Sequence, residues 1–140
     1  MRYLCATAVL ALAIAFSACS PSPPPSPPAP TASARVADGA RLYAGNCAGC
    51  HQQDGQGIPG VYPSLAASPV VLGDPGPVAA WIVKGRRPTV TPAGRFPTIM
   101  PQFVWLKPDD VAALLTYLRS SFGNHAPAVD AGDVARALDQ

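Results

Sequence analysis

The chain has 140 residues, 18 of them proline, and its ten Lys and Arg residues exceed its eight acidic residues, all Asp, giving a net charge of +2. This length fits one domain, and the mild charge argues against a nucleic-acid partner, which usually needs a strongly basic face. Prolines occupy seven of the positions 21–30, so the folded part has about 90 residues, a size at which a core of side chains alone is marginal.

Residues 1–19 have the features of a bacterial secretion signal. Arg2 provides the positive start, and the apolar run over residues 4–16 is shorter than the ~20 residues that a membrane-spanning helix needs. The run ends in Phe16-Ser17-Ala18-Cys19, which resembles a lipoprotein signal with Phe16 where Leu is usual. The sequence therefore predicts a lipidated Cys19 on the periplasmic side of a membrane. Ordinary cleavage near Ala18, giving a soluble periplasmic protein, is the alternative.

Residues 20–35 form a linker rich in proline and serine. Such sequences adopt extended polyproline II, which rises ~3.1 Å per residue, so the segment reaches roughly 40 Å and would act as a flexible tether behind a lipid anchor. The folded domain is predicted over residues 36–125. Residues 126–140 form a C-terminal tail, in which 128–139 are a candidate for a short helix of unassigned purpose.

The segment Cys47-Ala48-Gly49-Cys50-His51 predicts the chemistry of the chain. The C-x-x-C-H signature attaches a c-type haem, because two thiols at this spacing bond the vinyl groups of one porphyrin and the next residue presents an imidazole to the iron. Redox-active disulfides and zinc sites use the same cysteine spacing. Zinc would lack ligands, since residues 20–140 contain no further cysteine and only one other histidine, His125. A thioredoxin-like site would need a preceding strand, and none is evident.

Three helices are predicted in the folded part. They cover residues 36–46, residues 77–84, which end at Gly85 and place Trp81 towards the haem, and residues 108–122. The predicted fold class is therefore all-α, with three main helices around one covalently attached haem and long irregular loops.

The last of these helices is the clearest. Pro108 begins it, Asp109 and Asp110 suit the positive end of the helix dipole, and Gly123-Asn124 stops it. Its apolar residues follow helical spacing at Val111, Leu114, Leu115, Leu118 and Phe122.

The chain resembles the class I, mitochondrial-type cytochrome c family over about residues 36–124. Gly39 and Tyr43 stand eight and four residues before the first haem cysteine, at the offsets of a glycine and an aromatic residue that contact the last helix in that family. Leu114 and Tyr117 stand at the matching offsets in the last helix. A narrower resemblance is to cytochrome subunits of bacterial membrane-associated dehydrogenases.

The resemblance also implies residues that support the haem. Pro63, 12 residues after His51, would offer its carbonyl to the ring N–H of the iron-bound histidine, which fixes the ring and raises its basicity. Leu65 would pack on the haem. A purely structural loop is the alternative, because Pro59 and Pro69 lie nearby.

Met100 is the expected second iron ligand. It is the single methionine after residue 1 and lies beside Pro101, and the resemblance implies that it binds the iron opposite His51. Such a pair favours reduced iron relative to two histidines. The alternatives are that Met100 fills a gap in the core and that His125, expected in solvent, is the ligand.

With both axial positions filled, the iron has no open site, so the chain is predicted to be a single-electron carrier and not an enzyme. The expected partners are redox proteins such as a membrane-associated dehydrogenase or oxidase, with no small-molecule substrate. Two other functions stay open. One is a haem enzyme, or a gas or peroxide sensor, in which Met100 is displaced; the other is a structural subunit whose haem stabilises a docking surface.

A basic cluster precedes the Met100 segment and consists of Lys84, Arg86, Arg87 and Arg95. If it surrounded the haem edge it would steer an acidic partner surface towards the haem. The alternative is that these charges solvate a loop or pair with the haem propionates.

Overall fold

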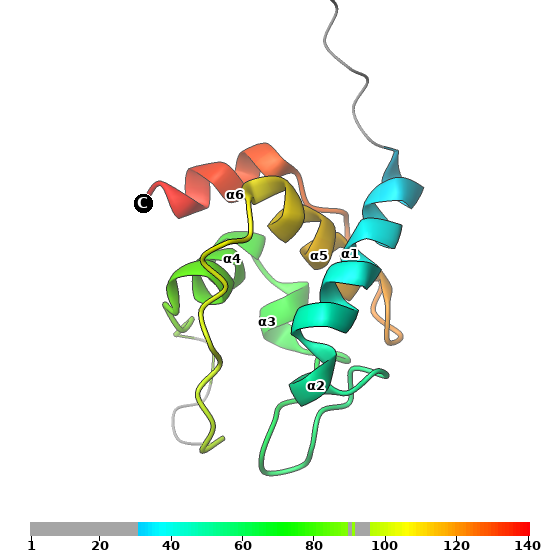
Figure 1. Cartoon of the computed structure of the whole chain (residues 1–140), viewed down its shortest axis with the longest axis vertical. Helices are drawn as coiled ribbons and strands as arrows, with labels where there is room; N and C mark the ends of the chain where they lie inside the picture. The colour runs from blue at the N-terminus through cyan, green and yellow to red at the C-terminus, as the bar shows by residue number, and fades with distance from the viewer. Residues whose placement is uncertain (1–30, 90, 92–95) are drawn as a thin grey trace, which may run out of the picture.

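A computed structural model of the chain describes residues 31–89, 91 and 96–140. Its helices are α1 (Ala32–Asn46), α2 (Ala48–His51), α3 (Pro69–Leu72), α4 (Pro75–Lys84), α5 (Pro108–Ser120) and α6 (Ala131–Leu138), arranged as in Figure 1. The three main helices that were predicted are α1, α4 and α5. Within the described residues, β-type pairing is limited to an isolated bridge between Ile58 and Tyr62, and the all-α fold class is confirmed.

The predicted signal peptide, including Cys19, and residues 20–30 of the predicted linker lie outside the described residues. Thr31 caps α1, because its side chain accepts a hydrogen bond from the Ala34 N–H at 3.2 Å. The helix therefore begins at Ala32, and residues 32–35, which were assigned to the linker, are helical. No helix in the described part of the chain is both long enough and apolar enough to cross a bilayer.

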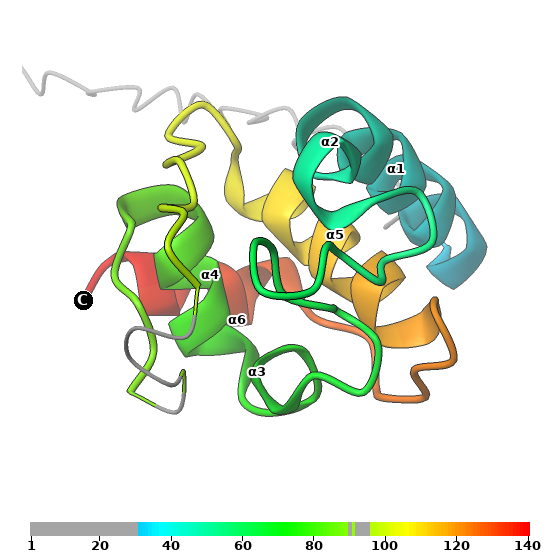
Figure 2. The same cartoon turned by 90° about the horizontal axis from the view of Figure 1, so that it is seen from below.

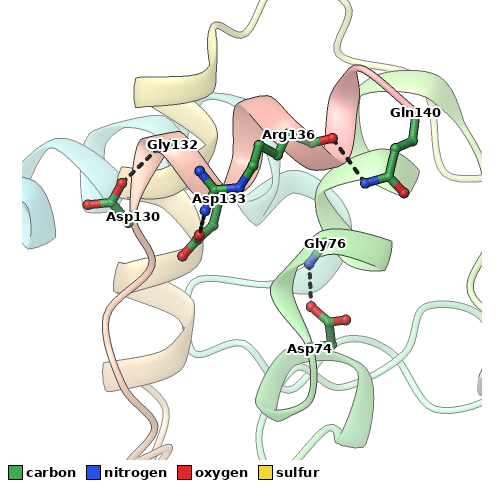
Figure 3. A network of polar contacts seen from close by, with 7 residues as sticks. All are labelled: Asp74, Gly76, Asp130, Gly132, Asp133, Arg136 and Gln140. Carbon is green, nitrogen blue, oxygen red and sulfur yellow. Dashed lines mark hydrogen bonds and ion pairs between the residues drawn. The ribbon is translucent and has the colours of Figure 1, made fainter.

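Aspartate side chains begin α4 and α6. Asp74 accepts a hydrogen bond from the Gly76 N–H at 2.9 Å, and Asp130 accepts one from the Gly132 N–H at 2.8 Å (Figure 3). Each bond satisfies an amide that has no partner inside its own helix. The caps explain why α4 begins two residues before the predicted position 77 and why a helix forms within the predicted range 128–139.

The helices α1 and α5 cross at a glycine. A Cβ atom added at Gly39 would lie 2.1 Å from the carbonyl oxygen of Ala113 and 2.6 Å from the Cβ of Tyr117, so the crossing requires a residue without a side chain. One turn later Tyr43 is buried, and its ring centroid lies 5.5 Å from that of Tyr117 and 5.2 Å from that of Phe122. The predicted contact between the first and last main helices is confirmed.

A buried arginine joins α5 to two other segments. Arg119 is only 6% exposed. Its Nη1 donates to the carbonyl oxygens of Val71 and Gly73, each at 2.7 Å, and its Nε donates to that of Pro127 at 2.8 Å. Among the described residues this guanidinium forms no ion pair, so backbone carbonyls alone satisfy it. The bonds tie the end of α3 and the chain that leads into α6 to the core, where α6 packs against α4 and α5 (Figure 2).

Candidate haem site

The described part of the chain encloses a largely apolar cavity of about 400 Å³. Pockets that bind small molecules and cofactors typically measure roughly 300–1,000 Å³. The predicted site residues of the folded domain all line this cavity, namely Cys47, Cys50, His51, Pro63, Leu65 and Met100. Segments far apart in the sequence therefore meet here, as the haem prediction requires.

One helical turn presents the two thiols and the imidazole to the cavity. The backbone N–H groups of Cys50 and His51 donate to the carbonyl of Cys47 at 3.1 and 2.9 Å, which closes α2. Residues at positions i, i+3 and i+4 share a helix face, so the C-x-x-C-H spacing places all three side chains together.

The environment of Cys47 argues against a redox-active disulfide. Burial, assisted by the neighbouring Cys50, raises the pKa of the Cys47 thiol to about 11. A thiol in a catalytic cysteine pair has a lowered pKa, because its thiolate is the reactive form. No disulfide joins Cys47 to Cys50, and both side chains line the cavity.

The ring of His51 is oriented by a backbone carbonyl. Its Nδ1–H donates to the carbonyl oxygen of Pro63 at 2.9 Å. Because a carbonyl oxygen only accepts, Nδ1 carries the proton and Nε2 keeps the lone pair that a metal ion needs. Burial lowers the pKa of His51, although the bond to Pro63 acts in the opposite direction, and the imidazole is therefore neutral at neutral pH.

Gly57 allows the carbonyl of Pro63 to reach His51, and its role was not predicted. Its N–H donates to the His51 carbonyl at 2.9 Å. Its φ is +65°, and an added Cβ would lie 2.4 Å from the carbonyl oxygen of Tyr62 and 2.6 Å from that of Pro63. Glycine alone tolerates this conformation and this approach. The Gly-Gln-Gly run at 55–57 was the available signal, since such runs mark turns.

Asn124 holds the cavity wall on the side of α5. It is 2% exposed; its Oδ1 accepts from the Ala67 N–H at 2.8 Å, and its Nδ2 donates to the carbonyls of Leu65 at 3.1 Å and Leu118 at 2.8 Å. These three partner residues all line the cavity. The sequence indicated Asn124 only as a helix stop, and no local pattern reveals its long-range bonds.

Met100 enters the cavity from residues 96–106. Figure 2 shows this yellow-green segment on the side of α4, whereas α2 lies beside α1. The helices α4 and α5 add apolar side chains at helical spacing, namely Val78, Trp81, Ile82, Leu114 and Leu118. Trp81 thus lies on the expected side, and Ala113 rather than Leu114 takes the place next to Gly39. His125 is exposed and does not line the cavity.

The described members of the basic cluster lie apart from one another. Lys84 donates from Nζ to the carbonyl of Leu138 at the end of α6. Arg87 lines the cavity, and its guanidinium lies 5.5 Å from the centroid of the Trp81 ring. Arg86 does not line the cavity, and Arg95 lies outside the described residues.

The donor set around the cavity fits a c-type haem. It comprises two thiols, an imidazole with Nε2 free for iron and one thioether, within walls that are mostly apolar. The family model described as cytochrome c matches residues 36–122. The chain belongs to the cytochrome c family. It is an electron-transfer protein, and its cofactor is one covalently bound c-type haem.

Relatives of two kinds resemble this cytochrome. It is 37% identical over 93 residues to cytochrome c-552 of Thermus thermophilus, which covers 63% of the chain and 70% of that protein. A second cytochrome c-552, from another strain of the same species, is also 37% identical, and the chain covers 62% of its length.

The other relatives are subunits of larger enzymes. The cytochrome c subunit of the quinone alcohol dehydrogenase of Gluconobacter oxydans is 35% identical over 101 residues, covering 70% of this chain and 21% of that subunit. The gluconate 2-dehydrogenase cytochrome c subunit of Pantoea cypripedii is 37% identical over 102 residues, covering 69% of this chain and 23% of that subunit. The chain thus spans less than a quarter of these two subunits.

Proposed function

We propose that Cys47 and Cys50 hold the haem through thioether bonds and that His51 and Met100 are its axial ligands. The observation that carries the proposal is the bond from His51 Nδ1 to the Pro63 carbonyl at 2.9 Å. It leaves Nε2 as the metal-binding atom, and Met100 lines the same cavity. The haem, when bound, supplies a one-electron redox centre. The chain orients His51, provides a thioether and keeps water from the apolar walls.

Spectroscopy of the exported, matured protein tests this assignment. We expect the pyridine haemochrome of a c-type haem and pigment that resists extraction by acidified acetone, because the attachment is covalent. Cys47→Ser and Cys50→Ser should each remove one thioether, and the double variant should yield extractable or no haem. His125→Gln is the control, since His125 is exposed. A colourless chain, or pigment lost to acid-acetone, would refute the attachment.

The same cytochrome is proposed to be tethered to a membrane on its periplasmic side. The support is the sequence Phe16-Ser17-Ala18-Cys19, followed by a proline-rich segment. Intact mass of the membrane fraction should correspond to a chain that begins at Cys19 and carries lipid. Cys19→Ser should move the cytochrome to the soluble fraction without changing its spectrum. A native protein already soluble and free of lipid would contradict the tether.

The proposed electron donor is a membrane-associated dehydrogenase, which in turn would make the cytochrome a link to a respiratory acceptor. The similarity to the cytochrome subunits of an alcohol dehydrogenase and a gluconate dehydrogenase supports this. Membranes from the source cells, supplied with an alcohol or with gluconate, should reduce the purified cytochrome. Reduction by neither substrate would contradict a donor of these two kinds.

A closed iron also separates a carrier from a ligand sensor. With His51 and Met100 bound, the reduced protein should bind carbon monoxide poorly at neutral pH. Rapid and complete binding would favour the alternative in which Met100 is displaced by a gas or peroxide.

A further inference from the structure

Two segments that border the cavity carry no charged residue. Residues 57–73 and 96–106 contain no Asp, Glu, Lys, Arg or His, and both contribute lining residues. Among the described residues that line the cavity, Arg87 alone has a formal charge at neutral pH, and its guanidinium lies over the ring of Trp81. The cavity therefore opens between uncharged loops.

Three exposed aliphatic side chains come together where these segments meet; we refer to Ile58, Val61 and Ile99 as the apolar rim. Ile99 is 93% exposed, and the other two are also exposed. The hydroxyl of Thr98 donates to the carbonyl of Val61 at 2.6 Å, which joins the two segments. The chain from Ile58 to Tyr62 is closed by mutual backbone hydrogen bonds of 2.9 and 2.8 Å.

The apolar rim lies at the mouth of the cavity. Tyr62, Thr98 and Ile99 belong both to this junction and to the cavity lining. A side chain as exposed as Ile99 contributes little to the core of its own molecule. Clustered exposure of apolar side chains beside a binding site is typical of an interaction surface.

We propose that the apolar rim docks a redox protein whose own contact face is apolar and uncharged. The proposal rests on the proposed function, because docking at this mouth brings a partner next to the haem. A charged partner face would lose hydration here without gaining an ion pair, whereas an apolar face gains from burial of the rim. A lipid surface fits less well, since membrane-binding surfaces usually combine apolar residues with a Lys- or Arg-rich face, and the two segments have neither.

Electron self-exchange tests the proposal with the protein as it exists. Each copy presents the same rim, so a second copy is a partner of the required chemistry. One electron leaves a reduced copy and enters an oxidised copy, and no bond or proton changes. The exchange rate constant is measured by NMR line broadening in mixtures of the two forms. For the parent it should change by less than about twofold between low and high salt, because exposed charges are screened by salt and uncharged contacts are not.

Ile99→Lys and Val104→Lys form a matched pair of variants. Both add one positive charge, but Val104, 66% exposed, is not among the residues that line the cavity. Ile99→Lys should lower the rate constant roughly tenfold at low salt and recover partly at high salt, because two like charges meet at the contact. Val104→Lys should change it by less than about twofold on the same grounds. Equal effects of the two variants, or no effect of Ile99→Lys, would overturn the proposal.

Two further measurements keep the outcome specific. Ile99→Ser should slow exchange without creating salt dependence, which separates the loss of apolar contact from added repulsion. Both Ile99 variants should keep the parent's midpoint potential and axial-ligand bands, because Ile99 is not a ligand. A parent without the spectrum of a His–Met haem would refute the axial assignment, independently of the rim. Binding of the parent to phosphatidylcholine vesicles that Ile99→Lys abolishes would overturn the proposal in favour of a lipid surface.

Discussion

Gly39 lies so close to α5 that a single methyl group on it would come within 2.1 Å of the carbonyl oxygen of Ala113. Backbone atoms cannot move aside as a flexible side chain can, so Gly39→Ala must push α1 and α5 apart. We expect it to lower the free energy of unfolding by about 2 kcal/mol or more, as overpacked cores do. Guanidinium unfolding of the oxidised cytochrome measures this.

Gly45→Ala is the control within the same helix. An added Cβ at Gly45 meets no atom within 4 Å, so this change should be neutral or stabilise the protein by up to ~1 kcal/mol through helix propensity. Equal losses at Gly39 and Gly45 would show that the helix crossing does not set the requirement.

Met100→Ala should open the sixth position of the iron. The midpoint potential should fall by on the order of 0.1 V, because the axial ligand is a main determinant of haem potential. The reduced variant should also bind carbon monoxide, which visible spectroscopy detects. Gln102→Ala, in the same segment but exposed and not lining the cavity, should leave both properties unchanged. An unaltered spectrum for Met100→Ala would refute the ligand assignment.

Asn124→Ala should loosen the wall of the haem cavity. The substitution leaves the buried Ala67 N–H and two carbonyls without their partners, at a cost of about 2–4 kcal/mol by the usual penalties for unsatisfied groups. Thermal unfolding measures the loss. Gln140→Ala removes an exposed amide with a single bond to the Arg136 carbonyl and should cost less than ~0.5 kcal/mol. An Asn124 variant as stable as the Gln140 variant would contradict this role.

Arg119→Met should destabilise the cytochrome far more than Arg136→Met. Arg119 is buried and loses three hydrogen bonds, for a loss of about 3 kcal/mol. Arg136 pairs with Asp133 on the surface, where such pairs contribute at most ~1 kcal/mol. Urea unfolding of the two variants compares them directly, and similar midpoints would argue against a structural role for the buried guanidinium.

The haem-binding motif was readable from the sequence because its chemistry lies in a few residues at short, constant spacing. Cys47, Cys50 and His51 occupy one helical turn, and this local geometry follows from the spacing itself. The boundaries of α5 were also predicted well, since Pro108 and the two aspartates mark its start. Pro63 and Met100 were placed through a family resemblance, and the structure brings both to the same cavity as His51.

The contacts that were missed are long-range. Asn124 reaches Leu65 and Ala67, 59 and 57 residues away, and Arg119 reaches Val71, 48 residues away. A polar residue after a helix looks like an ordinary stop signal, and an arginine in a last turn looks like a partner for the helix dipole. The folded chain alone determines which carbonyls these side chains meet. The exposed rim residue Ile99 carried no local signal either, since exposure depends on the packing of other segments.

The early start of α1 has a mechanical consequence. The helix runs from Ala32 to Asn46, directly before Cys47, and its 15 residues span about 22 Å at 1.5 Å per residue. Figure 1 shows its first turn at the opposite end from α2. A force applied to the chain ahead of Thr31 therefore acts on the far end of a stiff rod that is clamped to α5 at Gly39. Such a rod keeps the cysteine pair at a constant stand-off from the point of attachment, whatever direction the pull takes.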